Sequence, residues 1–151
     1  MKHKVIKFLR DIFPFILTVA LWRLSWPWIN PAGILAIIPI FFCSFIFYIP
    51  GFSIFALVFC FLLDYKFNTV LTWTMFYCFF YIIINVQNFL DLTHTTKNGL
   101  FVFMLFITGP LLCMLFNNIS LTTFENGLYL FLLICIMYLP ITRLVKALRN
   151  D

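Results

Sequence analysis

The sequence predicts an all-α integral membrane protein, with about six transmembrane helices in one compact bundle and no soluble domain. The first observation is composition: 64% of the residues are hydrophobic, 10% are charged, and the mean hydropathy is +1.08. Soluble domains contain roughly 45–50% apolar and about 25% charged residues. The second is that the longest polar connection, about residues 85–98, is too short to fold alone. We therefore expect residues 1–151 to form a single polytopic membrane domain.

Apolar runs separated by polar or proline-containing breaks define the predicted spans. A membrane-crossing helix needs about 20 mainly apolar residues. Pro50 and Gly51 form a strong turn pattern that divides the long apolar stretch 34–63 into two pieces. Pro14 is expected in the first helical turn, where its missing N–H costs little. The third predicted span is short, and a re-entrant segment would have a similar sequence. The six predicted spans are residues 12–28, 34–49, 52–63, 69–86, 100–116 and 127–145.

The distribution of basic residues predicts the orientation. Cytoplasmic loops of membrane proteins carry an excess of Lys and Arg. With six spans, the outer side holds only Arg23 and Lys66. The cytoplasmic side holds Lys2, Lys4, Lys7, Arg10, Lys97, Arg143, Lys146 and Arg149. This bias predicts a multi-pass protein with both termini in the cytoplasm.

Six residues are candidates for structural or interaction roles. Arg23 and Asp64 are ionisable residues at the predicted outer interface, where they could form an ion pair. Alternatively, Arg23 snorkels among tryptophans and Asp64 ends its helix in headgroup water. Pro50 and Gly51 break the apolar stretch, and Gly109-Pro110 is expected to kink the fifth span.

The sequence indicates that the protein is not an enzyme. It contains no H-E-x-x-H, G-x-S-x-G or P-loop motif, and Asp64 and Asp91 fall on opposite sides of the predicted membrane. Asp91 and His94 are too few ligands for a metal site. We expect no catalytic, cofactor-binding or metal-binding residues. The net charge of +5 does not indicate nucleic-acid binding, because the basic residues gather at the two ends of the chain, so the expected partner is membrane lipid.

One part of the sequence goes beyond general hydrophobicity. Ser-Trp-Pro-Trp at residues 25–28 is followed by Asn30-Pro31, by two apolar pieces divided at Pro50, and by an apolar run that ends in Leu63-Asp64-Tyr65. This order resembles the bacterial rod-shape-determining MreD family, in which a proline-punctuated pair of spans ends in a Leu-Asp-Leu-like sequence. The close of the chain, residues 130–149, is also similar to that of the family.

The resemblance implies a non-catalytic subunit of the cell-wall elongation complex in the bacterial inner membrane. It implies partners as well: an MreC-like single-span coiled-coil protein, an MreB-like filament and the peptidoglycan synthases. The role would be to maintain rod shape.

A different class of protein remains open as an alternative. Substrate-binding S components of vitamin transporters are also small six-span proteins, and they need convergent polar groups near the outer face. Such groups could come from Arg23, Asp64, Lys66, Asn117 and Asn118. A third possibility is an accessory subunit of some other membrane complex. A neighbouring gene for a coiled-coil protein would favour wall elongation, whereas genes for ATPase subunits would favour transport.

Overall fold

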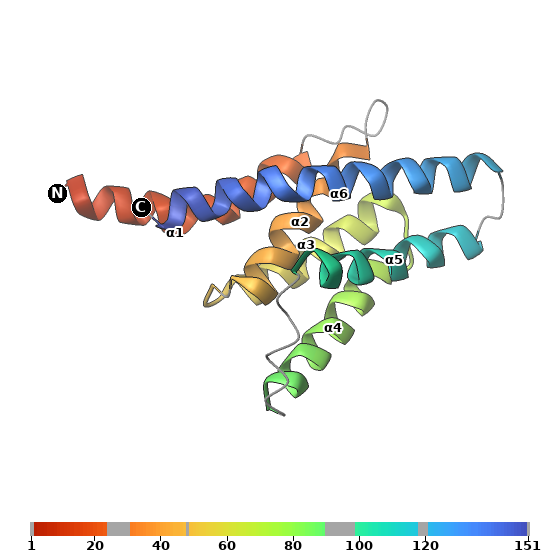
Figure 1. Ribbon diagram of the computed structural model, residues 1–151, viewed down its shortest axis with the longest axis horizontal. Helices are drawn as coiled ribbons and strands as arrows, with labels where there is room; N and C mark the ends of the chain where they lie inside the picture. Colours follow the sequence, from red (N-terminus) through yellow and green to blue (C-terminus); the bar gives the residue numbers. More distant parts are fainter. Residues whose placement is uncertain (1, 24–30, 48, 90–98, 118–120, 151) are drawn as a thin grey trace.

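The computed structural model describes residues 2–23, 31–47, 49–89, 99–117 and 121–150 (Figure 1). These residues contain helices and short turns but no β-strand. The all-helical class predicted from the sequence is therefore confirmed for the described part of the chain.

Two long helices form one side of the molecule. Helix α1 covers Lys2–Arg23 and α6 covers Leu121–Asn150 (Figure 1). Both reach further into the charged flanks than the predicted spans do. As a result, Pro14 lies in the interior of α1, so its placement in the first turn is wrong. The threonine one turn later, Thr18, donates its hydroxyl to the Pro14 carbonyl oxygen at 2.8 Å. Residues 24–28 of the first predicted span lie outside the described residues.

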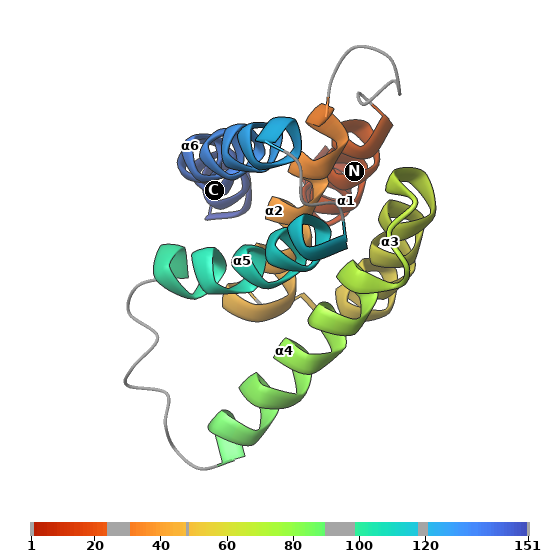
Figure 2. The same cartoon turned by 90° about the vertical axis from the view of Figure 1, so that its right-hand side faces the viewer.

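The second helical segment occupies the centre of the molecule and has three parts. A 3₁₀ turn, η1, covers Pro31–Ala36; α2 covers Ile37–Phe41; and a π-helical turn, η2, covers Phe42–Ile46. Every residue from 34 to 44 is buried. The segment packs against α1, α3 and α6 (Figure 2). An apolar helix buried on all sides forms the core around which the other helices assemble.

The predicted break at Pro50-Gly51 is a turn in the structure. Gly51 has a φ of 79°, a left-handed conformation that a glycine adopts without steric cost. Helix α3 then runs as one uninterrupted helix over Phe52–Phe67, and thus continues past the expected end at residue 63. At 1.5 Å per residue, its 16 residues span about 24 Å.

The remaining helices pack closely against one another. Helix α4 covers Thr72–Phe89, and α5 covers Gly99–Asn117 and passes through Gly109-Pro110 without interruption. A Cβ atom at Gly109 would lie 2.7 Å from Cδ1 of Phe76 on α4 and would overlap the ring. The glycine therefore permits the close approach of α4 and α5.

The outer surface of the described part of the chain is apolar. Helices α1, α3, α4, α5 and α6 all carry exposed large apolar side chains in addition to buried ones; Ile54, Ile136 and Met75 are examples, at 75%, 70% and 67% exposed. One segment, Phe124–Leu148 within α6, is long and apolar enough to cross a membrane. The other apolar helical stretches are shorter: Ile34–Ile46, Thr72–Asn85 and Gly99–Cys113.

The two chain ends lie at the same end of the molecule (Figure 1). Helix α1 leads away from that end and α6 returns to it, and the two helices pack against each other. The last turn of α5 and the first turn of α6 lie at the opposite end (Figure 1).

Candidate functional site

Asp64 lies at the centre of a polar network between α3 and α4. Its side chain is 3% exposed. One carboxylate oxygen accepts hydrogen bonds from the Thr69 hydroxyl at 2.6 Å and from the Trp73 backbone N–H at 2.9 Å. The other accepts from the backbone N–H and the hydroxyl of Thr74, at 2.9 and 2.7 Å. All four donors therefore belong to the turn after α3 and the first turn of α4.

The local sequence explains how this network forms. Helix α3 ends at Asn68, whose φ of 52° is left-handed, and the Thr69 N–H bonds back to the Asp64 carbonyl oxygen at 3.0 Å. The chain then reverses, so the first turn of α4 faces the end of α3. Free N–H groups at a helix start need acceptors and favour a nearby negative charge. Asp64 thus caps α4 from the preceding helix.

The ion pair considered between Arg23 and Asp64 is not among these contacts, and Arg23 is exposed. The alternative, that Asp64 ends its helix in headgroup water, is also wrong, because the carboxylate is buried. Instead, Lys66, which follows the predicted span, donates from Nζ to the Trp22 carbonyl oxygen at 2.8 Å. The Lys66 ammonium also lies 4.7 Å from the centre of the Trp22 ring. Partial burial, followed by repulsion from Arg23, lowers the pKa of Lys66.

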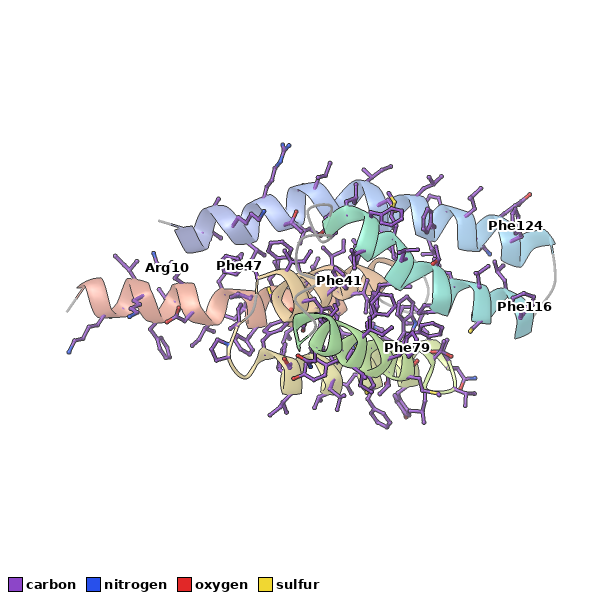
Figure 3. The ribbon with its side chains drawn as sticks, turned by 60° about the horizontal axis from the view of Figure 1, so that its bottom comes forward. Arg10, Phe41, Phe47, Phe79, Phe116 and Phe124 are labelled. Carbon is purple, nitrogen blue, oxygen red and sulfur yellow. The ribbon has the colours of Figure 1, made fainter. Side chains whose placement is uncertain are left out.

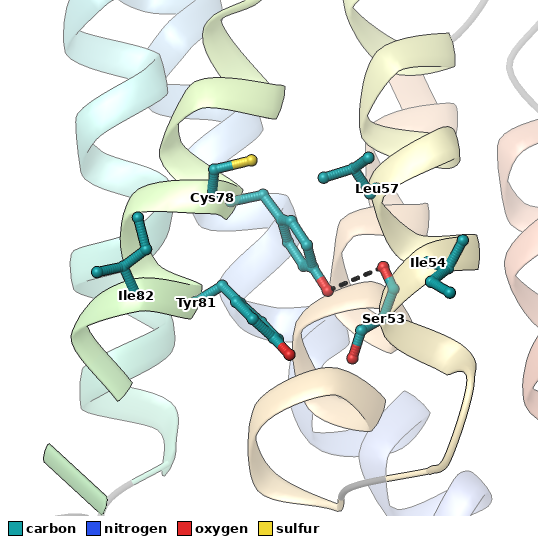
Figure 4. A pocket seen from close by; sticks show the side chains of 7 residues that line it. Ser53, Ile54, Leu57, Cys78, Tyr81 and Ile82 are labelled. Carbon is teal, nitrogen blue, oxygen red and sulfur yellow. Dashed lines mark hydrogen bonds between the residues drawn. The ribbon is translucent and has the colours of Figure 1, made fainter. Parts of the chain in front are cut away.

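A second candidate site is a groove of about 380 Å³ between α3 and α4 (Figure 4). The Tyr77 hydroxyl lies 3.0 Å from Ser44 Oγ and 3.4 Å from the Ser53 carbonyl oxygen, and its single proton is shared between these two acceptors. The Ser53 hydroxyl is buried without a hydrogen-bond partner among the described residues. The walls of the groove are Ser53, Ile54, Leu57, Tyr77, Cys78, Tyr81 and Ile82. Most of these side chains are apolar, so the groove suits an apolar occupant better than a charged one.

Sequence reasoning found Asp64 but missed its partners and the groove. The spacing of Thr69 and Thr74 after Asp64 does not predict their hydrogen bonds to its carboxylate unless the geometry of the α3–α4 turn is known. Tyr77 stands in an apolar run and gives no indication that it bonds to Ser44 on a distant segment. No group of three potential metal ligands is present in the described ranges. Asp91, His94 and Asn118 fall outside them.

Pro50, Gly51, Gly109 and Pro110 lie apart from the Asp64 network. The first two form the turn before α3, and the second two lie inside α5 against α4. The structure therefore does not gather the six candidates into one site.

Comparison with known proteins places the chain in no family: no family model, curated protein or solved structure matches it.

Proposed function

We propose that the protein is a non-catalytic, six-span subunit of the complex that elongates the bacterial cell wall. In this role it lies in the inner membrane with both termini in the cytoplasm. It acts with an MreC-like protein, an MreB-like filament and the peptidoglycan synthases to maintain rod shape. It contributes helix surfaces for partner proteins and no chemistry of its own.

The membrane placement is supported by the distribution of apolar and basic side chains. The described helices carry large apolar side chains on their outer faces, and water would disfavour such a surface. The two basic termini lie at the same end of the molecule, as an even number of spans requires (Figure 1). That end becomes the cytoplasmic one by the positive-inside rule.

The functional proposal is supported chiefly by the burial and the hydrogen bonds of Asp64. Among the described residues it is the only Asp, Glu, Lys or Arg whose side chain is buried. It is also the polar residue in the Leu63-Asp64-Tyr65 sequence that resembles the MreD family. Its four hydrogen bonds join α3 to α4 and leave little capacity for a solute. A buried carboxylate that joins two helices and binds no solute is expected in a subunit that contributes helix surfaces and no chemistry.

The transporter alternative receives less support from the same residues. A substrate pocket at the outer face would need Arg23, Asp64 and Lys66 to converge on a cavity. Instead, Arg23 is exposed, the Asp64 oxygens are occupied and Lys66 bonds to Trp22. The groove is lined by Ser53, near the start of α3, and by Tyr81, in the middle of α4, so it lies away from the Asp64 turn.

Co-purification of the tagged full-length chain in a mild detergent tests this proposal. We expect recovery of a single-span coiled-coil protein and wall-synthesis enzymes. Recovery of ATPase subunits in their place would contradict it. A matched pair of variants on exposed helix surfaces, Ile54→Ser and Ile136→Ser, then identifies which face of the bundle the partners cover, because neither change touches the core.

A further inference from the structure

The end of the molecule that carries both termini is strongly basic. Its described cations stand on the first turns of α1 and the last turns of α6, and the acidic residue on the same part of α1 is Asp11. The exposed cations at this end are Lys4, Lys7, Arg143 and Lys146. This concentration of positive charge attracts anions, whatever their source.

Arg10 differs from the other cations because part of its charged group is buried. Its Nε atom has no hydrogen-bond acceptor within the described ranges. A guanidinium stays charged in proteins, and a buried charged donor without an acceptor is costly. Lys7 lies three residues before Arg10, so the two side chains share a helix face. Together they offer several N–H donors to a single anion.

Apolar side chains are interleaved with these cations. Val5, Ile6, Phe8 and Leu9 on α1 are 56%, 60%, 64% and 57% exposed. A helix exposed on all sides that alternates basic and bulky apolar residues matches the boundary between lipid headgroups and acyl chains. There the apolar groups enter the acyl region while Lys and Arg reach the phosphates. A free anion in water would leave the apolar side chains uncovered.

The last turns of α6 bring a further cation to the same end. The Lys146 ammonium lies 5.6 Å from the centre of the Phe42 ring, and that ring stacks on Phe47 with centroids 6.1 Å apart. Figure 3 shows Arg10 and Phe47 toward the end of the molecule where both termini lie. Lys146 is exposed, and its contact with the Phe42 ring helps to keep the charge at this end.

We infer that the α1/α6 end binds the headgroup phosphate of an anionic phospholipid, with Arg10 as the main ligand and Lys7 beside it. The accessible part of the Arg10 guanidinium and the Lys7 ammonium donate to the phosphate, and the acyl chains cover the apolar residues of α1. This site rests on the membrane placement proposed above, but not on the identity of the protein partners. Loss of lipid binding would leave the co-purification result unchanged, so the two proposals fail separately.

Native mass spectrometry of the purified full-length chain, titrated with phosphatidylglycerol or with phosphatidylcholine of the same acyl chains, tests the inference. We expect phosphatidylglycerol to bind about tenfold more tightly. The Arg10→Gln variant should lose most of this preference, because it loses both the charge and the guanidinium. Arg10→Lys should retain part of it, since a lysine replaces the charge but not the fork of donors.

Lys4→Gln is the matched control, because it removes one exposed charge from the same helix. Its preference should change by no more than about twofold. If Lys4→Gln and Arg10→Gln lost the preference for phosphatidylglycerol equally, the Arg10 site would be contradicted. The preference would then come from the overall positive charge of this end. Displacement of phosphatidylglycerol by inorganic phosphate alone would assign the site to a soluble anion instead of a lipid. If Arg10→Gln does not elute as a folded species on gel filtration, Lys7→Gln replaces it, with the expected loss about half as large on a logarithmic scale.

Discussion

Charged side chains are handled differently in two regions of the molecule, the α3–α4 turn and the α1/α6 end. At the α3–α4 turn, a single carboxylate is buried and has four hydrogen-bond donors. At the α1/α6 end, several cations are exposed, and the buried Nε atom of Arg10 has no acceptor among the described residues. A buried charge with all its hydrogen bonds made contributes to the fold. The exposed cations at the α1/α6 end remain available to anions outside the chain.

Among the substitutions that test this comparison, removal of the Asp64 carboxylate should cause the largest loss of stability. Asp64→Ala leaves two backbone N–H groups and two hydroxyls without their acceptor, so we expect a loss of about 3 kcal/mol in the free energy of unfolding. Asp64→Asn keeps the shape and one acceptor oxygen and should lose less. Equilibrium unfolding in mixed detergent micelles measures both.

The control for Asp64 is Glu125→Ala, because Glu125 is an exposed acidic residue on α6. Its stability should change by less than about 0.5 kcal/mol. Equal effects of the Asp64 and Glu125 substitutions would contradict the structural role given to the buried carboxylate.

Gly109→Ala tests the close packing of α4 and α5 near the middle of the bundle. The new Cβ overlaps the Phe76 ring, so we expect a loss of about 1–3 kcal/mol in unfolding free energy. Gly127→Ala is the matched control, because its Cβ would lie 3.5 Å from Leu115 Cδ2, an ordinary contact. The control should be neutral or slightly stabilising, as alanine favours a helix over glycine. Rescue of Gly109→Ala by Phe76→Leu would show that the ring causes the loss.

Tyr77→Phe should have the smallest of the three effects. It removes the hydroxyl that bonds to Ser44 and Ser53 and keeps the ring, so we expect a loss of about 1 kcal/mol. Tyr65→Phe serves as the control, since the Tyr65 side chain is 83% exposed. If both tyrosines gave the same result in the same unfolding assay, the Ser44–Tyr77 bond would contribute nothing to stability.

The sequence predicted the coarse architecture because apolar runs and proline-glycine breaks are local patterns. The helical class and the turn at Gly51 depend only on neighbouring residues. The helix ends differ from the ends of the predicted spans. Helix α1 begins at Lys2 and α6 at Leu121, whereas the corresponding spans begin at residues 12 and 127. Apolar runs mark only the expected membrane-crossing part, and a helix can continue into the polar residues beside it.

The candidate sites were harder to predict because they depend on contacts between segments. Asp64 is recognisable from the sequence as an isolated charge, but its donors follow from the reversal of the chain at Asn68, and Arg23 is not one of them. Arg10 was counted only as one of several basic residues. Its buried Nε could not be inferred without the position of α1 against the rest of the bundle.

The proposed six-span arrangement puts the Asp64 turn and the basic end on opposite sides of a membrane. Two reporter fusions test it most directly, one joined after Asn68 and one after Asp151, each made with alkaline phosphatase and with a green fluorescent protein. We predict active phosphatase after Asn68 and a fluorescent fusion after Asp151. Active phosphatase at the C-terminus, or the same behaviour at both positions, would contradict the six-span arrangement.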